Sequence, residues 1–317
     1  MPVIPTISAS DDARKLADWT ELTALHSQRP LSVNDIIREI RRGGTTDALA
    51  GEEDLDDDVD EGSDDSERIA ESAFDVIERR EQACDGAYPF KLSTDGGSVE
   101  PTENSGSAPY SFLLLLSVFG LRSGPPGSFP ERTFEDLCAA AAATYLGGQD
   151  GPAEGLAFGF PRRYEAKGFG AALTDLYRRL GVGELKFGLE VEELSKSEKD
   201  SGIDVIAWRH FPDRDPGQLI AFGQCVVGWT DWKEKASALN PSAFCRKWLK
   251  VEPPSDPVPM YFIPFDPARG EKWRHLAADV GGVVFDRQRI AYLLQDCRAS
   301  ARHAAGEWSK HLLSAMR

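Results

Sequence analysis

The chain has 317 residues, a net charge of −16, and hydrophobic and charged fractions of 41% and 28%. Such a composition is typical of a folded protein, and the length allows one large domain or two small ones. The longest apolar run, residues 112–119, is far shorter than the ~20 residues of a membrane-spanning helix, and the N-terminus lacks the pattern of a secretory signal. We therefore expect no membrane partner.

The cysteine pattern argues against a disulfide framework and a zinc site. The number is odd, the spacing is wide, and no two are separated by two residues. We expect a reducing, cytoplasmic environment. The five are Cys84, Cys138, Cys225, Cys245 and Cys297.

Negative charge is concentrated in one run. The stretch from Glu52 to Glu67 holds 11 acidic residues and no basic ones. Because like charges repel and the run has little apolar surface to bury, we expect a flexible loop at about 44–66. A DNA mimic, or an autoinhibitory strip over a basic groove, is the functional alternative. The rest of the chain is only mildly acidic, so charge neither supports nor excludes DNA binding.

The first half predicts mainly helices. Ser32 with Asp35 three residues later is a capping-box pattern, and Gly43-Gly44 is a helix stop. The polar segment 91–108 predicts a second loop. Residues 11–43 fit either a docking or winged-helix-like module, or a helical lead-in that packs on the main core. The predicted helices cover residues 13–26, 32–43, 68–83 and 110–121.

The second half alternates helices and strands. Thr133 is expected to cap a helix that ends at Gly147. The final helix is expected to run from residue 287 to about residue 313. Other helices are predicted at 168–180, 230–239 and 243–249, and extended segments at 158–164, within 185–194, at 260–265 and at 282–286.

Residues 202–227 predict a β-hairpin that bears an acidic residue. The first arm is rich in β-branched residues, the second is almost wholly apolar, and the segment 212–217 is a dense turn signal. A turn centred near Arg214 places Asp204 opposite Gln224. An unpaired carboxylate costs several kcal/mol in an apolar strand, so Asp204 is a candidate site residue. The alternative is that Asp204 lies at an exposed strand end and is solvated.

The order of these elements resembles the PD-(D/E)xK nuclease superfamily, and within it the Mrr-like restriction endonuclease branch. The matching residues lie within about 130–290. They are Phe134-Glu135-Asp136-Leu137 at a helix start, Gly202-Ile203-Asp204-Val205-Ile206 on one strand, and Gln224-Cys225 on the next. The resemblance implies a restriction-endonuclease-like α+β core with a central mixed β-sheet flanked by helices, preceded by a mainly helical region.

The resemblance also implies a chemistry. Such enzymes hydrolyse phosphodiester bonds with Mg²⁺ or Mn²⁺, and such cations prefer oxygen ligands. Asp204 and Glu135 are the expected ligands, and Gln224 would supply a carbonyl oxygen where most of the superfamily has Glu. DNA is the expected partner, and a homo-oligomer is implied. Glu135 on its own is equally compatible with a surface residue that favours the helix dipole.

One position departs from the superfamily pattern. The usual lysine, which polarises the attacking water, is replaced by Val226. Either the site is inactive, or Lys233 or Lys235 on the following helix takes over the role. Lys235 is preferred because it lies one helical turn from Asp231. The alternative is that both lysines are solvated.

The sequence therefore predicts two units and three candidate functions. Residues 1–127 form the N-terminal region, which would recruit a protein partner, and residues 128–317 form the catalytic domain. The first candidate is a metal-dependent DNA endonuclease that acts in bacterial defence against phage DNA. The second is an inactive DNA-binding or adaptor subunit with the same fold. The third is a helical scaffold, which a central mixed sheet around Asp204 would exclude. No nucleotide-hydrolysis motif is present.

Overall fold

A computed structural model describes residues 2–48, 61–102, 107–147, 151–160, 168–186, 201–230, 232–295 and 300–316. The helices are α1 (Ala13–Ser27), α2 (Val33–Ala48), α3 (Glu61–Cys84), α4 (Ala108–Phe119), α5 (Pro130–Gly147), α6 (Phe169–Leu180), α8 (Trp232–Ala238), α9 (Pro241–Trp248), α10 (Glu271–Val280), α11 (Arg287–Leu294) and α12 (Ser300–Ala315), with a 3₁₀ turn at Asp85–Ala87. The strands are β1 (Leu31–Ser32), β2 (Phe90–Leu92), β3 (Ser98–Pro101), β4 (Ala153–Ala157), β5 (Glu184–Leu185), β6 (Val205–Arg209), β7 (Leu219–Cys225), β8 (Leu249–Val251), β9 (Val258–Phe262) and β10 (Val283–Phe285). In the described part of the chain, no helix is long and apolar enough to cross a membrane.

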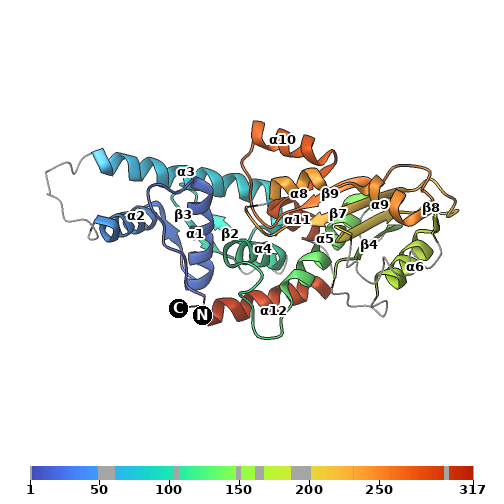
Figure 1. Cartoon of the computed structure of the whole chain (residues 1–317). Coiled ribbons are helices and arrows are strands. Elements are labelled where there is room, and N and C mark those ends of the chain that lie inside the picture. The colour runs from blue at the N-terminus through green and yellow to red at the C-terminus, as the bar shows by residue number, and fades with distance from the viewer. Residues whose placement is uncertain are drawn as a thin grey trace.

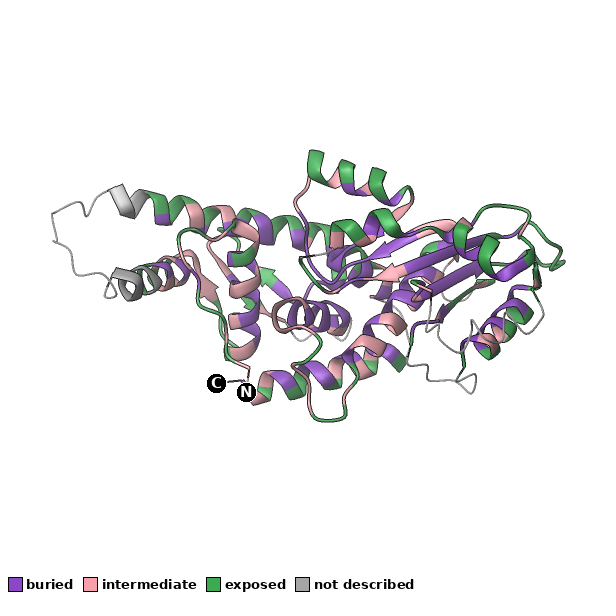
Figure 2. Ribbon diagram, viewed as in Figure 1, coloured by how far each residue is buried: buried purple, intermediate pink, exposed green. Residues whose placement is uncertain are grey.

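A five-stranded mixed sheet is the core of the second half of the chain, on the right in Figure 1. Its order is β10-β9-β7-β6-β4, with β4, β6 and β7 antiparallel and β9 and β10 parallel to β7. One hydrophobic cluster joins one face to α4, α5, α11 and α12, and a second joins the other face to α6, α8 and α9. Figure 2 shows the strands buried between these helices. The predicted α+β class is confirmed, and the purely helical scaffold is excluded.

The hairpin of β6 and β7 has the predicted register. Val205 pairs with Gly223 and Arg209 with Leu219, which puts Asp204 opposite Gln224 at the open end. Ile206 and Phe222 lie fully buried on one face, while Val205 and Ala221 pack on the other. Period-2 alternation together with a well-marked turn therefore suffices to set the pairing.

Helix α5 lies directly on β4. A Cβ atom at Gly155 would come closer than 3.0 Å to the carbonyl of Ala139, so only glycine permits this approach. The predicted cap at Thr133 is wrong, since the helix already begins at Pro130. Proline suits a first helical position because its ring fixes φ there and its missing N–H has no intrahelical partner to lose.

The N-terminal region combines three helices with a small antiparallel sheet. Its element order is α1-β1-α2-α3-β2-β3, and its sheet order is β1-β3-β2. This is a winged-helix-like arrangement, one of the two alternatives from the sequence. The exposed positions of α3 include Glu67, Glu71, Asp75 and Glu78. The helix that would enter a DNA groove in such a module thus presents mainly acidic side chains.

Two predicted loops are corrected by the structure. The segment 91–108 contains a hairpin, because Asp95 accepts a hydrogen bond from the Gly97 N–H (3.2 Å) and Gly96 takes φ of +70°, so the chain reverses. In the acidic stretch, α2 passes through Gly43-Gly44 to Ala48 and α3 already begins at Glu61. Acidic residues near a helix N-terminus are favoured by the helix dipole. Residues 49–60 lie outside the described residues.

Smaller differences concern the second half. The expected extended segment 158–164 follows a strand that ends at Ala157, and its residues 161–164 lie outside the described residues. Within 185–194 only a short β5 is described. The final helix is two helices, α11 and α12. Strand β8 and helix α10 were not predicted. Strand β8 is only three residues long, whereas α10 was missed although its apolar residues do have helical spacing (Trp273, Leu276, Ala277 and Val280).

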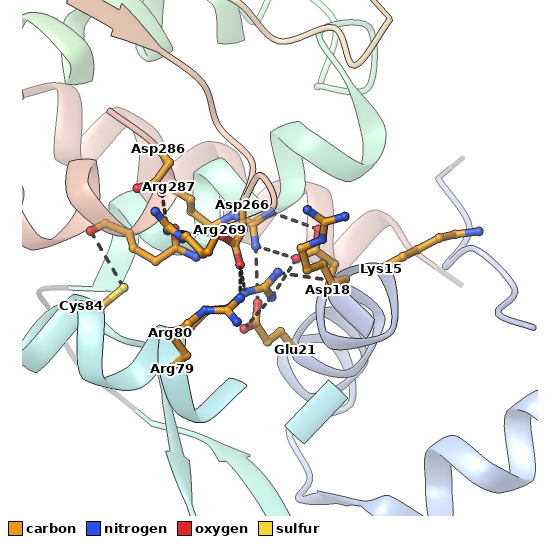
Figure 3. Close-up of polar contacts among 12 residues, drawn as sticks. Lys15, Asp18, Glu21, Arg79, Arg80, Cys84, Asp266, Arg269, Asp286 and Arg287 are labelled. Carbon is orange, nitrogen blue, oxygen red and sulfur yellow. Dashed lines mark hydrogen bonds and ion pairs between the residues drawn. The ribbon is translucent and has the colours of Figure 1, made fainter. Parts of the chain in front are cut away.

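A buried ionic cluster joins the N-terminal region to the rest of the chain (Figure 3). The Arg80 guanidinium lies 2.8 Å from Asp18, 3.0 Å from Glu21 and 3.0 Å from Asp266, and its side chain is fully buried. Arg287 lies 2.7 Å from Asp18. We call these five residues the ionic cluster. Helices α11 and α12 pack on α4 and share its hydrophobic core. The domain boundary at 127/128 stays a prediction.

Candidate functional site

Asp204 immediately precedes β6, where regular pairing with β7 ends. Its carboxylate accepts a hydrogen bond from the backbone N–H of Cys225 (2.8 Å), a donor that a strand neighbour would otherwise satisfy. Its carbonyl accepts from the N–H groups of Phe158 (2.7 Å) and Gly159 (3.1 Å). Asp204 is thus held from both adjacent strands, and its half-buried side chain is still reached by solvent.

Glu135 reaches the same place from α5. Its carboxylate lies over Gly159, where an added Cβ would approach its oxygens closer than 3.0 Å. Gly159 in turn donates its N–H to the Asp204 carbonyl, so the helix residue and the hairpin residue meet at one end of the sheet. Glu135 is half-buried. We call Glu135 and Asp204, with Gly159 between them, the carboxylate edge.

Two cysteines lie beside these carboxylates. Burial raises the pKa of Cys138 and of Cys225, and the charges of Glu135 and Asp204 raise both further. The two thiols hydrogen bond with each other, which lowers the pKa of Cys138 and raises that of Cys225. They stay protonated at neutral pH, which disfavours a role as nucleophile or metal ligand. Sequence reasoning missed this pair, although Cys138 lies one helical turn after Glu135.

Gln224 lies opposite Asp204 in the strand register and is half-buried. Alternation along β7 nevertheless places it on the face of Phe222, whereas Cys225 lies on the face of α5. The Asp204 carboxylate turns toward Cys225. The structure thus brings Glu135 and Asp204 together and sets Gln224 on the other face of the same strand end.

The structure also describes Val226, which occupies the usual lysine position, and the two candidate substitutes, Lys233 and Lys235. Val226 is 2% exposed and belongs to the hydrophobic cluster on the Gln224 face. Helix α8 covers that face, since the Trp232 carbonyl accepts a hydrogen bond from Tyr261. Lys233 is exposed, with its ammonium 5.6 Å from the centre of the Trp232 ring, and Lys235 is half-buried. Asp231, from which the Lys235 preference was argued, lies outside the described residues.

The donor set fits a magnesium ion better than zinc. Among the described residues, no three His, Cys, Asp or Glu side chains converge in the manner of metal ligands. Mg²⁺ commonly takes only one or two protein carboxylates and completes its shell with water or substrate oxygens. Glu135 and Asp204, half-buried at a strand end, can supply those two, while the protonated thiols supply none.

Comparisons with known proteins add no identification. No protein-family model matches the chain, and no curated protein matches it. A crystal structure of protein VC1899 from Vibrio cholerae is similar at 12% identity, covering 88% of this chain and 82% of that one, with a TM-score of 0.17. A likeness that weak supports no conclusion about fold or function, so the case rests on the residues themselves.

Proposed function

We propose that this protein is a Mg²⁺- or Mn²⁺-dependent DNA endonuclease of the PD-(D/E)xK type. The observation that carries the proposal is the carboxylate edge. Two acidic residues 69 positions apart meet at Gly159, at the open end of a hairpin: the Glu135 carboxylate lies over it, and the Asp204 backbone carbonyl accepts its N–H. The charges of both carboxylates raise the pKa values of Cys138 and Cys225, so both lie near the same pair of thiols.

The roles of the residues follow from their positions. A bound Mg²⁺ would hold the phosphate, activate the attacking water and stabilise the leaving oxygen. Asp204 and Glu135 would hold the cation, and the Cys225 N–H and the rigid strand end orient Asp204. The Lys235 ammonium is the proposed substitute for the missing lysine charge, with Lys233 second, and either would have to reach around the strand end because α8 covers the Gln224 face. Gln224 would complete the site only through a side-chain turn around the strand end.

The order of elements behind the resemblance is helix, inserted helix, hairpin, helix, two strands and helix. Helices α5 and α6, the β6–β7 hairpin, α8, β9, β10 and α11 occur in that order, with additional elements between them, among them strand β4 between α5 and α6. We propose a cytoplasmic protein that acts as a homo-oligomer against foreign DNA. The acidic face of α3 favours a protein partner, rather than DNA, for the N-terminal region.

One observation favours a second candidate, an inactive DNA-binding or adaptor subunit. The position of the usual lysine is filled by Val226, which is part of the core. If neither lysine of α8 serves the site, the carboxylate edge lacks the charge that stabilises the transition state.

A cleavage assay on plasmid and phage DNA tests the proposal. Wild type should cut with Mg²⁺ or Mn²⁺ and not with EDTA. Asp204→Asn preserves shape and hydrogen bonding but removes the charge, and should lower the rate by at least about 100-fold. The matched control is Asp213→Asn in the exposed hairpin turn, which should cut like wild type. Undiminished cleavage by Asp204→Asn would reject the nuclease assignment. DNA binding without cleavage by wild type would favour the adaptor.

A further inference from the structure

A pocket of about 390 Å³ lies where the N-terminal region meets the loops after β7 and β9. Strands β7 and β9 are parallel, and the pocket residues Trp229 and Asp266 follow their carboxyl ends. In open α/β sheets this end is where ligands bind. The apolar part of the lining is Pro5, Ile7, Trp19, Leu22, Val118 and Trp229.

Trp229 is a fixed aromatic platform in this pocket. One face of its ring stacks on Phe265, with ring centres 3.8 Å apart and planes 22° apart. The residue is nevertheless 47% exposed. Trp232 contacts Phe265 edge-on at 5.6 Å and so steadies the stack. A large apolar ring that is held rigid and left open on one side is suited to stack a flat ligand.

A second pocket of about 270 Å³ adjoins the first and is basic. It shares Arg14 and Trp229 with the first pocket, and adds Lys233, Lys272 and His275. Both lysines are exposed, and neither forms an ion pair with another residue of the described part of the chain. Positive charge therefore lines the same pocket as the Trp229 ring. We call the two joined pockets the tryptophan groove.

Most acidic residues of the groove pair with arginines. Burial alone would raise the pKa of Asp18, but the charges of Arg287 and Arg80 outweigh it and lower that pKa. Asp266 behaves in the same way through Arg80 and Arg269. Both carboxylates are thus compensated within the ionic cluster, as Figure 3 shows. Asp12 pairs with Arg14 at 2.6 Å, and the exposed Asp279 also lines the second pocket, so the cations left there for a ligand are Lys233 and Lys272.

We propose that the tryptophan groove binds a nucleotide unit, with its base on the open face of Trp229 and its phosphate facing Lys233 and Lys272. Aromatic stacking combined with neighbouring cations is how proteins hold nucleotides without reading sequence. The unit belongs either to a single strand of nucleic acid or to a free nucleotide. This binding needs neither Glu135 nor Asp204, so it goes beyond the proposed nuclease function.

Fluorescence anisotropy of the full chain tests the groove. The probe is fluorescein-labelled 12-nucleotide oligodeoxythymidylate in EDTA, which suppresses cleavage. Trp229→Ala should weaken binding about ten-fold or more, because one base–aromatic stack is lost, and Trp229→Phe should restore part of it. The control is Phe211→Ala, an aromatic residue that is 56% exposed in the hairpin turn. Changing both Lys233 and Lys272 to Gln should make the slope of log binding constant against log salt concentration less steep by roughly 1.4.

The outcomes separate the two sources of the ligand and the two proposals. Displacement of the probe by micromolar thymidine monophosphate indicates a free-nucleotide site, and probe binding that the monophosphate does not displace indicates a strand. Failure of both ligands to bind, or equal binding by Trp229→Ala and wild type, overturns the proposal. Asp204→Asn should bind like wild type. If Asp204→Asn loses cleavage but keeps Trp229-dependent binding, the two sites are separate. If wild type does not cleave but binds through Trp229, the nuclease proposal fails and the binding proposal is still supported.

Discussion

The ionic cluster and the carboxylate edge each gather acidic side chains, yet their surroundings differ. In the cluster, Glu21 is fully buried against Arg80 and accepts hydrogen bonds from Tyr88 and Tyr110. At the edge, Glu135 and Asp204 are half-buried beside protonated thiols and backbone N–H groups.

This difference separates a structural site from a candidate functional one. A carboxylate matched to arginines and closed to solvent has no capacity left for a ligand, and it mainly fixes how elements pack. A carboxylate held by backbone groups at an open strand end keeps oxygens that solvent or a cation can reach. Acidic residues that stay half-buried at a strand end, rather than enclosed by arginines, are therefore the better candidates for a functional site.

The largest expected effect comes from breaking the cluster. Arg80→Met should lower the free energy of unfolding by about 3–5 kcal/mol, because Glu21 and Asp266 are left as poorly compensated buried charges. Urea denaturation measures it. Arg68→Met is the control, since that side chain is 74% exposed and pairs only locally with Asp65, and should stay within about 0.5 kcal/mol of wild type. An unchanged urea midpoint for Arg80→Met would mean that the ionic cluster does not stabilise the contact between the N-terminal region and the rest of the chain.

The next largest effect is expected at the carboxylate edge, from a change that displaces Glu135. Gly159→Ala pushes a methyl group into the Glu135 carboxylate, so cleavage should fall by about 100-fold through misplacement of one ligand. Gly168→Ala is the control, because no atom lies within 4 Å of its added Cβ. Cleavage rates and denaturation midpoints are compared. Wild-type cleavage by Gly159→Ala would show that the position of Glu135 does not matter to the reaction.

Acid should act on the cluster. The pKa values of Asp18 and Asp266 are lowered in the fold, so their contribution is present above the unfolded pKa of about 3.9 and is lost as pH falls below it. The slope approaches about 1.4 kcal/mol per pH unit for each proton taken up. Asp286, whose pKa is raised by burial, acts in the opposite sense. Asp266→Asn should flatten the fall in denaturation midpoint between pH 5 and 3, and an identical profile would contradict this.

The smallest effect concerns the rim of the cluster. Arg79 contacts the same Asp266 oxygen as Arg80, at 3.3 Å, but its side chain is 44% exposed. Arg79→Met should cost no more than about 1 kcal/mol, as exposed ion pairs do. Equal losses for the two neighbouring arginines, measured in the same urea series, would show that burial is not what distinguishes them.

Local patterns predicted much of the architecture. The hairpin register followed from alternation and turn chemistry, α1 and α6 from apolar periodicity, and α4 from its continuous apolar run. Of the candidate site, Glu135 and Asp204 both contact Gly159 and Gln224 lies on the face of Phe222, while their roles as metal ligands stay a prediction. Asp204 lies just outside the regular strand, so the face toward which its side chain points cannot be predicted from the residue types alone.

What the sequence did not reveal depends on distant partners. Arg287 pairs with Asp18, which is 269 positions away in the chain. Cys225 at the end of β7 hydrogen bonds with Cys138 in α5. The β2–β3 hairpin was hidden because its strands are short and polar on one side. Such contacts are decided by tertiary packing, which pattern reading does not reach.

The packing of α12 on α4 affects how the protein is made. Helix α4 has five consecutive fully buried residues, Phe112 to Leu116, and α12 follows roughly 180 residues later. At about 5–20 residues per second, a ribosome exposes that apolar helix for on the order of ten seconds or more before its cover emerges. Nascent chains of this protein are therefore expected to rely on chaperones during translation, and truncations before α12 to aggregate.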